Sequence, residues 1–364
     1  MFVCGLLGWR AMIVGISLFH LYPATSASSL NPPIGQKPLF ATVNEVHGYN
    51  YSIGFSLQSS FGAAAAIIDK FDGQTATVAR VFHGGAEYER VMTRLSLETS
   101  RHIAPPYDDD GQFWADQPRK VVREALKAAQ LPASYEVLIL AQVIQRLRSE
   151  IESTLGIEIQ EAVFAASHLV ALYQDDIQDA AAYSGIKYVI PKGLHDPFVW
   201  ETAAAYAGHG FGLCKHWQDD DACADEGKQM PSETILAVHY SRTALTVSLT
   251  VISQALWAWE PDYRRVENFT LGSDSIKSYP NREDYWTDVK DTILSINTQF
   301  PLFPKPGKVL VTGDLDGGDF IDFLRSTMEE YLGTAPHFLT NDTTTAAAKG
   351  AAQFMRRGPA AWSP

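Results

Sequence analysis

One serine lies in a segment close to a known nucleophile motif. The segment Gly54-Phe-Ser-Leu-Gln58 differs at one position from G-x-S-x-G, in which small flanking residues let a serine turn sharply between a strand and a helix. Ser56 would then attack a carbonyl, with a histidine as its base and an aspartate to orient that histidine. The histidines considered for this role are His168, His195 and His239. Because Gln58 replaces the last glycine and residues 63–68 are typical of a second strand, a serine hydrolase is kept only as an alternative.

Two cysteines in one acidic segment suggest a covalent link. Cys214 and Cys223 are nine positions apart, and thiols this close can form a disulfide in an oxidising compartment. The alternative is a pair of reduced thiols without a role. His209 and His216 lie nearby but do not complete a recognised zinc-ligand spacing. The sequence therefore predicts a Cys214–Cys223 disulfide and no metal site.

Three acidic clusters are expected to serve structure rather than catalysis. The triplet at 108–110 falls in a proline-containing stretch, 104–116, that is predicted to be a loop. The cluster within 219–226 lacks the glycine and spacing of a calcium loop, so a solvated acidic surface is expected at both places. Asp175, Asp176 and Asp179 fall in the first turns of a predicted helix, where the helix dipole favours acidic residues, and we expect them to cap it.

The composition excludes several classes of protein. The chain has 364 residues, of which 46% are hydrophobic and 20% charged, as in an ordinary globular protein of two subdomains. It carries 29 Lys and Arg against 42 Asp and Glu, a formal net charge of −13. Nucleic acid and anionic membrane surfaces are negatively charged, so neither is an expected partner.

The N-terminus has the pattern of a secretory signal peptide. Arg10 precedes a short apolar run, and small residues follow at 24–27. The run is shorter than the ~20 apolar residues that span a bilayer, so a cleaved signal is favoured over a signal-anchor. We therefore expect the endoplasmic reticulum lumen or secretion, with Cys4 removed and no membrane attachment afterwards. The sequons that would permit glycosylation are Asn50, Asn268 and Asn341.

Hydrophobic periodicity predicts strands interleaved with helices. A block of strands opens each half of the chain, so the pattern favours a duplicated α/β fold. The predicted strands are 51–56, 63–69, 75–82, 161–166, 187–190, 234–239, 243–252 and 308–312. The predicted helices are 134–155, 175–183, 201–206, 283–299, 319–331 and 346–356.

Six weak motifs in the same order resemble one family. Ser52-Ile-Gly-Phe-Ser-Leu-Gln-Ser-Ser-Phe61 is similar to the first phosphate loop, A-I-G-I-D-L-G-T-T-Y, of the 70-kDa heat-shock chaperones. Residues 235–249 resemble the second loop, V-L-I-F-D-L-G-G-G-T-F-D-V-S-I, and Trp200-Glu-Thr-Ala-Ala-Ala205 resembles E-P-T-A-A-A. The remaining matches cover 153–186, 309–314 and 342–352. The chain thus resembles the nucleotide-binding domain of this DnaK-like group of the actin-like ATPase superfamily.

The resemblance implies a fold and its division. It implies a duplicated ribonuclease H-like fold, with two lobes around a central nucleotide cleft. The segment from Leu249 to Gly313 is shorter than in the family, so the upper part of lobe II is expected to be trimmed, and the family's peptide-binding domain is not expected to follow. The expected segments are a signal peptide at 1–27, a leader at 28–45, lobe I at 46–207, an acidic insertion at 208–232, lobe II at 233–358 and a tail at 359–364.

The resemblance also implies which residues face the nucleotide. In the family, two hairpin turns wrap the phosphates with backbone N–H groups, and an aspartate in each holds Mg²⁺ through water. The corresponding residues in the first turn are Gly54, Ser56, Gln58, Ser59 and Ser60, and those in the second are His239, Ser241, Arg242 and Thr243. On the adenosine side they are Gly313, Asp314, Gly317 and Gly318. The candidate catalytic carboxylate is Glu201, one place after the family's glutamate.

The substitutions in these turns predict weak or no hydrolysis of ATP. Ser56 and His239 stand where the family has its aspartates, so the carboxylate cage for Mg²⁺ is lost. We therefore predict ATP or ADP binding with weak or no hydrolysis and little dependence on Mg²⁺. The alternatives are an ATPase with rearranged catalytic residues, a nucleotide-free scaffold with a protein partner, and the serine hydrolase. The sequence does not specify that partner or an oligomeric state.

Overall fold

The computed structural model describes residues 50–357, except 71–72, 192–193, 195–197, 259 and 316–317. Several sequence predictions lie outside these residues. They are the signal peptide, the leader and the tail, and the site residues His195 and Gly317.

The first sheet opens with an antiparallel meander. Strands β1 (Asn50–Leu57), β2 (Phe61–Asp69) and β3 (Thr75–His83) pair in sequence, with Leu57 opposite Gly62 at the first turn. Strand β4 (Glu161–Ala166) then pairs parallel to β1, and β5 (Lys187–Tyr188) and β6 (Val199–Trp200) pair parallel to β4. The strand order is β3-β2-β1-β4-β5.

The second sheet repeats this arrangement. Strands β7 (Glu233–Tyr240), β8 (Leu245–Ile252) and β9 (Arg265–Asn268) form an antiparallel meander. Strand β10 (Lys308–Thr312) pairs parallel to β7, and β11 (His337–Leu339) pairs parallel to β10. Its order, β9-β8-β7-β10-β11, matches that of the first sheet strand for strand. This repeat confirms the predicted duplicated α/β fold with two sheets.

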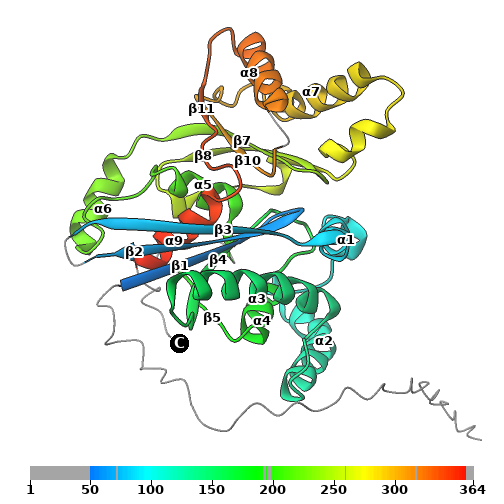
Figure 1. Ribbon diagram of the computed structural model, residues 1–364. Helices are drawn as coiled ribbons and strands as arrows, with labels where there is room; N and C mark the ends of the chain where they lie inside the picture. Colours follow the sequence, from blue (N-terminus) through cyan, green and yellow to red (C-terminus); the bar gives the residue numbers. More distant parts are fainter. Residues whose placement is uncertain are drawn as a thin grey trace, which may run out of the picture. The chain divides into compact units, whose positions relative to one another are not determined.

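Two helices built of small residues lie between the sheets (Figure 1). They are α5 (Glu201–Gly208) and α9 (Ala346–Arg356), and their backbones touch where each carries a glycine. A Cβ on Gly350 would stand 1.7 Å from the Ala204 carbonyl oxygen, and one on Gly208 would stand 1.9 Å from that of Ala346. Larger side chains would push the helices apart, so this contact explains the alanine-rich sequences.

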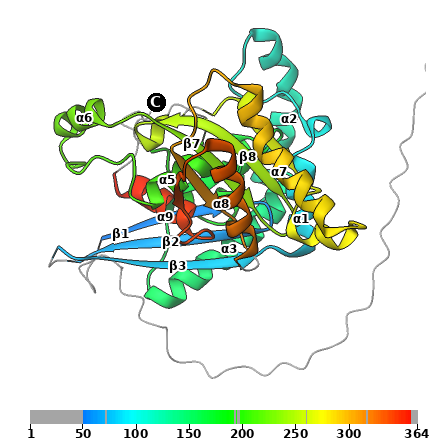
Figure 2. The same ribbon diagram turned by 90° about the horizontal axis from the view of Figure 1, so that it is seen from above.

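Longer amphipathic helices cover the outer faces of the sheets. Helix α3 (Tyr135–Leu155), with α1 (Gly85–Leu95) and α4 (Gln174–Tyr183), packs on the first sheet. Helices α7 (Arg282–Gln299) and α8 (Asp319–Leu332) cover β7, β8 and β10, and Figure 2 shows them from above. Helix α3 begins at Ser134, whose hydroxyl accepts from Val137 N, and ends at Gly156 with φ 67°. Both ends agree with the helix predicted over 134–155.

The loop predicted over 104–116 is partly wrong. Helix α2 (Asp110–Ala128) begins inside it, and the Asp109 carboxylate accepts from Gln112 N at 2.8 Å. The second aspartate of the triplet therefore caps a helix, while all three remain exposed as expected.

The capping role predicted on α4 is also incomplete. Asp176 does accept a hydrogen bond from Tyr173 N. However, Asp176 and Asp179 are buried and pair with Arg123 of α2, and Asp175 pairs with Arg119 at 2.7 Å. These aspartates attach α4 to α2 through ion pairs. The sequence of α4 alone does not indicate the arginines that pair with them.

The acidic insertion contains a helix and the predicted disulfide. Helix α6 (Asp220–Gln229) is capped by Asp219, and Cys214 is bonded to Cys223. In the described part of the chain, no helix has the length and apolar character needed to cross a bilayer.

Candidate functional site

The turns of the two β-hairpins meet directly. Ser59, after β1, lies with its hydroxyl 2.7 Å from Nε2 of His239, the next-to-last residue of β7. The same hydroxyl is 2.7 Å from that of Ser241, in the turn that follows β7. All three side chains are buried. The position between the two turns is therefore occupied by hydrogen bonds of the protein itself.

A second set of hydrogen bonds joins the turns through Asp314. One carboxylate oxygen accepts from the Ser60 hydroxyl at 3.0 Å, and the other accepts from the Arg242 backbone N–H at 3.0 Å. His83, at the end of β3, lies 3.6 Å from the first oxygen. Asp314 follows β10, so three segments far apart in the sequence converge on one carboxylate.

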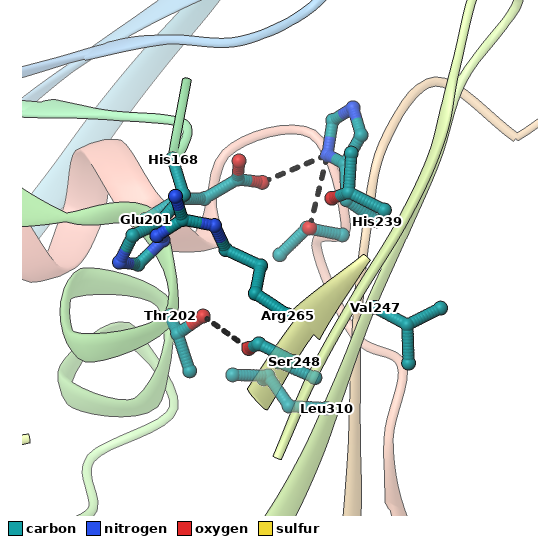
Figure 3. Close-up of a pocket in the computed structure, with 11 residues that line it drawn as sticks. His168, Glu201, Thr202, His239, Val247, Ser248, Arg265 and Leu310 are labelled. Carbon is teal, nitrogen blue, oxygen red and sulfur yellow. Dashed lines mark hydrogen bonds and ion pairs between the residues drawn. The ribbon is translucent and has the colours of Figure 1, made fainter. Parts of the chain in front are cut away.

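The His239 imidazole is held from its other side by a carboxylate (Figure 3). Nδ1 lies 2.9 Å from Oε1 of Glu201, the first residue of α5, and 3.1 Å from the Thr312 hydroxyl at the end of β10. The second oxygen of Glu201 accepts from Ser167 at 2.5 Å. Ser59, His239 and Glu201 thus form a continuous hydrogen-bonded chain with the order of a catalytic triad.

Burial and mutual attraction have opposite effects on the pKa values of His239 and Glu201. Burial disfavours the imidazolium, yet the Glu201 carboxylate raises the pKa of His239 above its ordinary value. Burial likewise disfavours the Glu201 carboxylate, but His239 and the Ser167 and Thr312 hydroxyls hold its pKa below the ordinary value. Each residue thus stabilises the charged form of the other, which favours a hydrogen-bonded ion pair.

A small cavity adjoins the pair (Figure 3). Its volume is about 20 Å³, enough for one water molecule and too small for a phosphate group. Besides Glu201 and His239 it is lined by polar side chains that include His168, Ser248 and Thr312. Burial lowers the pKa of His168, which stacks on Trp200 at a ring distance of 3.8 Å, so this histidine is neutral.

Two residues predicted to face the nucleotide are part of the core. The Ser56 hydroxyl lies within β1 and accepts from the Gln58 amide at 3.3 Å. Both side chains are fully buried. The serine hydroxyl that contacts a histidine is that of Ser59, three residues beyond the Ser56 of the hydrolase alternative.

The glycines that were predicted to face the nucleotide lie in different structural surroundings. A Cβ on Gly54 would lie 2.2 Å from Ala352 N, so this glycine lets α9 pack on β1. A Cβ on Gly313 would lie 1.8 Å from the Tyr240 carbonyl oxygen, and its φ of +119° also favours glycine. Gly318 precedes α8 with an ordinary φ of −79° and no close contact.

The predicted cation of the second turn points away from the cavity. The Arg242 side chain is 42% exposed and pairs with Asp274 at 3.0 Å. Thr243 lies beside it in an open surface groove, whose lining includes both residues. The backbone N–H of Thr243 donates to the Ser241 hydroxyl at 3.3 Å.

Three site residues were not found from the sequence. Ser167 and Thr312 support Glu201 and His239, and Glu260 is buried 3.5 Å from His168. Ser167 and Thr312 follow or end the parallel strands β4 and β10. A polar residue at the carboxyl end of the corresponding parallel strand in each sheet is the signal that would have indicated them.

The structure also places the remaining predicted sites. Asn50 and Asn341 are exposed, whereas Asn268 is half-buried and its side-chain oxygen accepts from Thr270. In the described residues, no group of three or more histidine, cysteine, aspartate or glutamate side chains is placed to hold a metal ion.

Comparisons with known proteins give matches among solved structures. No family model matches the sequence, and no curated protein matches it. Among solved structures, the fold is similar to that of the ethanolamine utilization protein EutJ from Carboxydothermus hydrogenoformans. The likeness has a TM-score of 0.43 and 11% sequence identity, and it covers 84% of this chain and 90% of that one. The two sheets of equal strand order show a duplicated α/β fold. The resemblance to the 70-kDa chaperones stays a prediction.

Proposed function

We propose that this chain is a divergent protein of the nucleotide-binding actin-like fold that does not hydrolyse ATP and acts as a binding scaffold. One observation carries the proposal: the Ser59 hydroxyl bonds both His239 and Ser241 at 2.7 Å, between the two turns. A nucleotide would have to break these bonds before its phosphates could enter. ATP and ADP therefore bind weakly, and the partner that gives the scaffold its role is a protein.

The charges around the link support the absence of hydrolysis. Mg²⁺ prefers several oxygen ligands, and carboxylates supply its charge balance. By the resemblance, Ser56 and His239 occupy the positions of the family's two aspartates, so neither supplies a carboxylate. The Glu201 carboxylate already accepts a hydrogen bond from Ser167 and pairs with His239. The Asp314 carboxylate is likewise engaged, by the Ser60 hydroxyl and the Arg242 backbone N–H, which argues against its positioning an attacking water molecule.

Calorimetric titration of the mature chain tests the proposal. ATP and ADP are titrated with and without Mg²⁺, beside an assay for released phosphate. We expect dissociation constants above about 100 µM, a change with Mg²⁺ of less than about threefold, and no release above background. Turnover that depends on Mg²⁺ would contradict the proposal, as would binding in the nanomolar range.

Restoring the aspartates gives a further test. In Ser56→Asp with His239→Asp, the new carboxylate at 239 would face Glu201, which then loses its cation. Two carboxylates that share a site repel one another, so this variant is less stable at pH 7 than at pH 5. We expect no ATP hydrolysis from it, because the Ser60–Asp314 and Arg242–Asp314 bonds still close the turns.

A second candidate function is nucleophilic catalysis by Ser59. The Ser59–His239–Glu201 chain, with distances of 2.7 and 2.9 Å, favours it. Ser59 is only 1% exposed, so a substrate could reach it only after the turns separate. A fluorophosphonate probe separates the two candidates: stoichiometric labelling that is absent in Ser59→Ala supports the hydrolase, and no labelling supports the scaffold.

We also propose that the protein resides in the secretory pathway. The Cys214–Cys223 disulfide supports this location, because such bonds persist in oxidising compartments. Mass spectrometry of the protein from its native host, under non-reducing conditions, tests the proposal through the disulfide and the N-terminal residue. A free thiol pair and a retained N-terminus would contradict it.

A further inference from the structure

Strand β3 forms a long edge of the first sheet. The strand order places it at one end of that sheet, and Figure 2 shows it along the border. Its nine residues pair with β2 in a single register without a bulge. The strands at the other ends of the two sheets, β5, β9 and β11, have two to four residues. An edge strand offers its outer backbone groups to another chain, so among the described strands β3 offers the longest row of them.

The pairing with β2 shows which backbone groups of β3 point outward. In an antiparallel pair, residues alternate between bonding the neighbouring strand and facing away from it. At one end of the ladder, Lys70 N donates to the Gln74 carbonyl oxygen, and at the other end Gly84 N donates to that of Ser60. The even-numbered residues of β3 therefore bond β2. Residues 75, 77, 79, 81 and 83 direct their N–H and C=O groups away from the sheet, where β3 has no strand partner within the described residues.

Arg80 places a positive charge at the middle of this edge. One nitrogen of its guanidinium donates to the outward carbonyl oxygen of Ala79 at 2.8 Å, and another donates to the Thr154 hydroxyl of α3 at 3.0 Å. In the part of the chain that the structure describes, no carboxylate pairs with Arg80, although the chain carries a net charge of −13. An acidic side chain brought to this edge would therefore find an arginine without an anionic partner.

The side chains of β3 define what a further strand would meet on each face. Val78 and Phe82 pack with the core under α3, on the same face as Arg80, and Ala79 and Val81 pack on the opposite face with α9. In a strand added antiparallel to β3, the residues opposite 78, 80 and 82 would form the close pairs, whose Cα atoms are about 4.5 Å apart. A carboxylate opposite Arg80 could then reach the guanidinium, and apolar side chains two positions to either side would cover Val78 and Phe82.

We propose that the β3 edge binds an extended, acidic segment of the protein partner as an additional antiparallel strand. The segment places a glutamate or aspartate opposite Arg80 and apolar residues two positions before and after it. The inference rests on the proposed scaffold function and adds to it the surface that binds the partner and the chemistry of the bound segment. A second copy of this chain fits less well, since a two-fold pairing centred on Ala79 would make the two Arg80 side chains neighbours with no carboxylate between them.

Fluorescence anisotropy with the labelled peptide Thr-Val-Thr-Glu-Thr-Val-Thr tests the proposal. We expect the wild type to bind it with a dissociation constant of about 100 µM, and at least about tenfold more weakly when lysine replaces the glutamate. In Arg80→Glu this preference should be reversed. The control is Arg282→Glu, which should bind as the wild type does, because Arg282 is 66% exposed on α7 and pairs with Asp319. No binding to the wild type up to about 1 mM peptide overturns the proposal, as does a preference that Arg80→Glu leaves unchanged.

Hydrogen exchange locates the bound peptide. The outward amides of Thr77, Ala79 and Val81 should exchange quickly in the free protein and slowly with the peptide, whereas those of Val78 and Arg80, which bond β2, should change little. Ala79→Pro removes an outward N–H and leaves the β2 ladder intact, so it should abolish binding while the fold is kept. Protection of other segments by the peptide overturns the proposal. Protection in the free protein that rises with protein concentration would indicate a second copy and overturn it too.

The peptide and the nucleotide are measured separately. A protein that binds neither the peptide nor ATP keeps the scaffold role and loses the β3 site. Turnover that depends on Mg²⁺, beside intact binding of the peptide, would overturn the scaffold role and keep the β3 site.

Discussion

Glu201 and His239 form a buried ion pair, with Oε1 and Nδ1 2.9 Å apart, between the first turn of α5 and the end of β7. Their residues are 5% and 4% exposed. Breaking such a pair by removing one partner leaves an uncompensated buried charge, which typically costs several kcal/mol. The hydrogen bonds continue from this pair to the Ser59 hydroxyl, which lies 2.7 Å from Nε2 of His239. The stability of the protein should therefore depend on it.

The pair predicts a characteristic dependence of stability on pH. The pKa of His239 is raised above 6.5, so its contribution is complete below that pH and is lost as the pH rises through the folded-state pKa. The pKa of Glu201 is lowered below 4.5, so its contribution is complete above that pH and is lost as the pH falls through the folded-state value. Stability from the pair is therefore greatest between about pH 4.5 and 6.5.

Urea unfolding of wild type and Glu201→Gln across pH measures this dependence. We expect the variant to be less stable by about 3 kcal/mol at pH 5.5, with a smaller difference at pH 9, where neutral His239 no longer compensates the carboxylate. The control is Glu98→Gln, whose carboxylate is 71% exposed and pairs only at the surface with Arg101. A difference between wild type and Glu201→Gln that does not change with pH would contradict the pairing.

Ser59 and Ser56 provide a matched pair of substitutions in the first turn. Both are buried, but Ser59 bonds across the turns to His239 and Ser241, whereas Ser56 bonds only Gln58 at 3.3 Å. Ser59→Ala leaves a buried imidazole nitrogen without its partner, which costs about 1–3 kcal/mol, and Ser56→Ala should cost about 1 kcal/mol or less. Hydrogen exchange of residues 58–61 and 240–244 should accelerate only in Ser59→Ala. If the two substitutions lowered the stability equally, the hydrogen bonds of Ser59 between the turns would not contribute to stability.

Much of the fold followed from the sequence because it depends on local pattern. The helix 134–155 has a clear apolar period, a serine cap and a terminal glycine, and the strands 161–166 and 308–312 are short apolar runs. The repeat of strand blocks predicted the repeat of sheets. Helix α2 was not predicted, because its large apolar side chains face solvent and its attachment depends on ion pairs with α4, some 55 positions later in the sequence.

Some members of the candidate site were singled out in the sequence, but its geometry was not. The resemblance indicated Ser59, His239, Ser241 and Asp314, and the structure brings all four into the link between the turns. That Ser59 and His239 touch could not be read from the chain, since 180 positions separate them and the resemblance implies phosphates between them. Glu201 was a candidate for catalysis, and only its orientation revealed its pairing with His239.

Substitutions of Gly54 and Gly318 test whether the glycines predicted to face the nucleotide are needed for packing of the protein or for nucleotide binding. In Gly54→Ala the new Cβ would lie 2.2 Å from Ala352 N and 2.4 Å from the Ala348 carbonyl oxygen, so α9 would have to move. We expect a loss of about 3 kcal/mol or more and a low soluble yield. In Gly318→Ala the nearest heavy atom would be 4.0 Å away, and the loss should be below about 1 kcal/mol. A Gly54→Ala protein with wild-type stability would contradict the packing role.

Arg123 tests how α2 is attached to the protein. Its guanidinium donates to Asp176, to Asp179 and to the Asp175 carbonyl oxygen, so Arg123→Met leaves the buried Asp176 without its cation and Asp179 with Lys127 alone. Removing one partner of a buried ion pair costs about 3–5 kcal/mol. Part of that loss should be local, and hydrogen exchange in 110–128 should accelerate more than in α3. The matched control is Arg90→Met, because Arg90 is 69% exposed and pairs with Glu87 on its own helix, a surface contact that contributes little to stability. If α2 keeps its protection in Arg123→Met, its attachment depends on contacts other than these ion pairs.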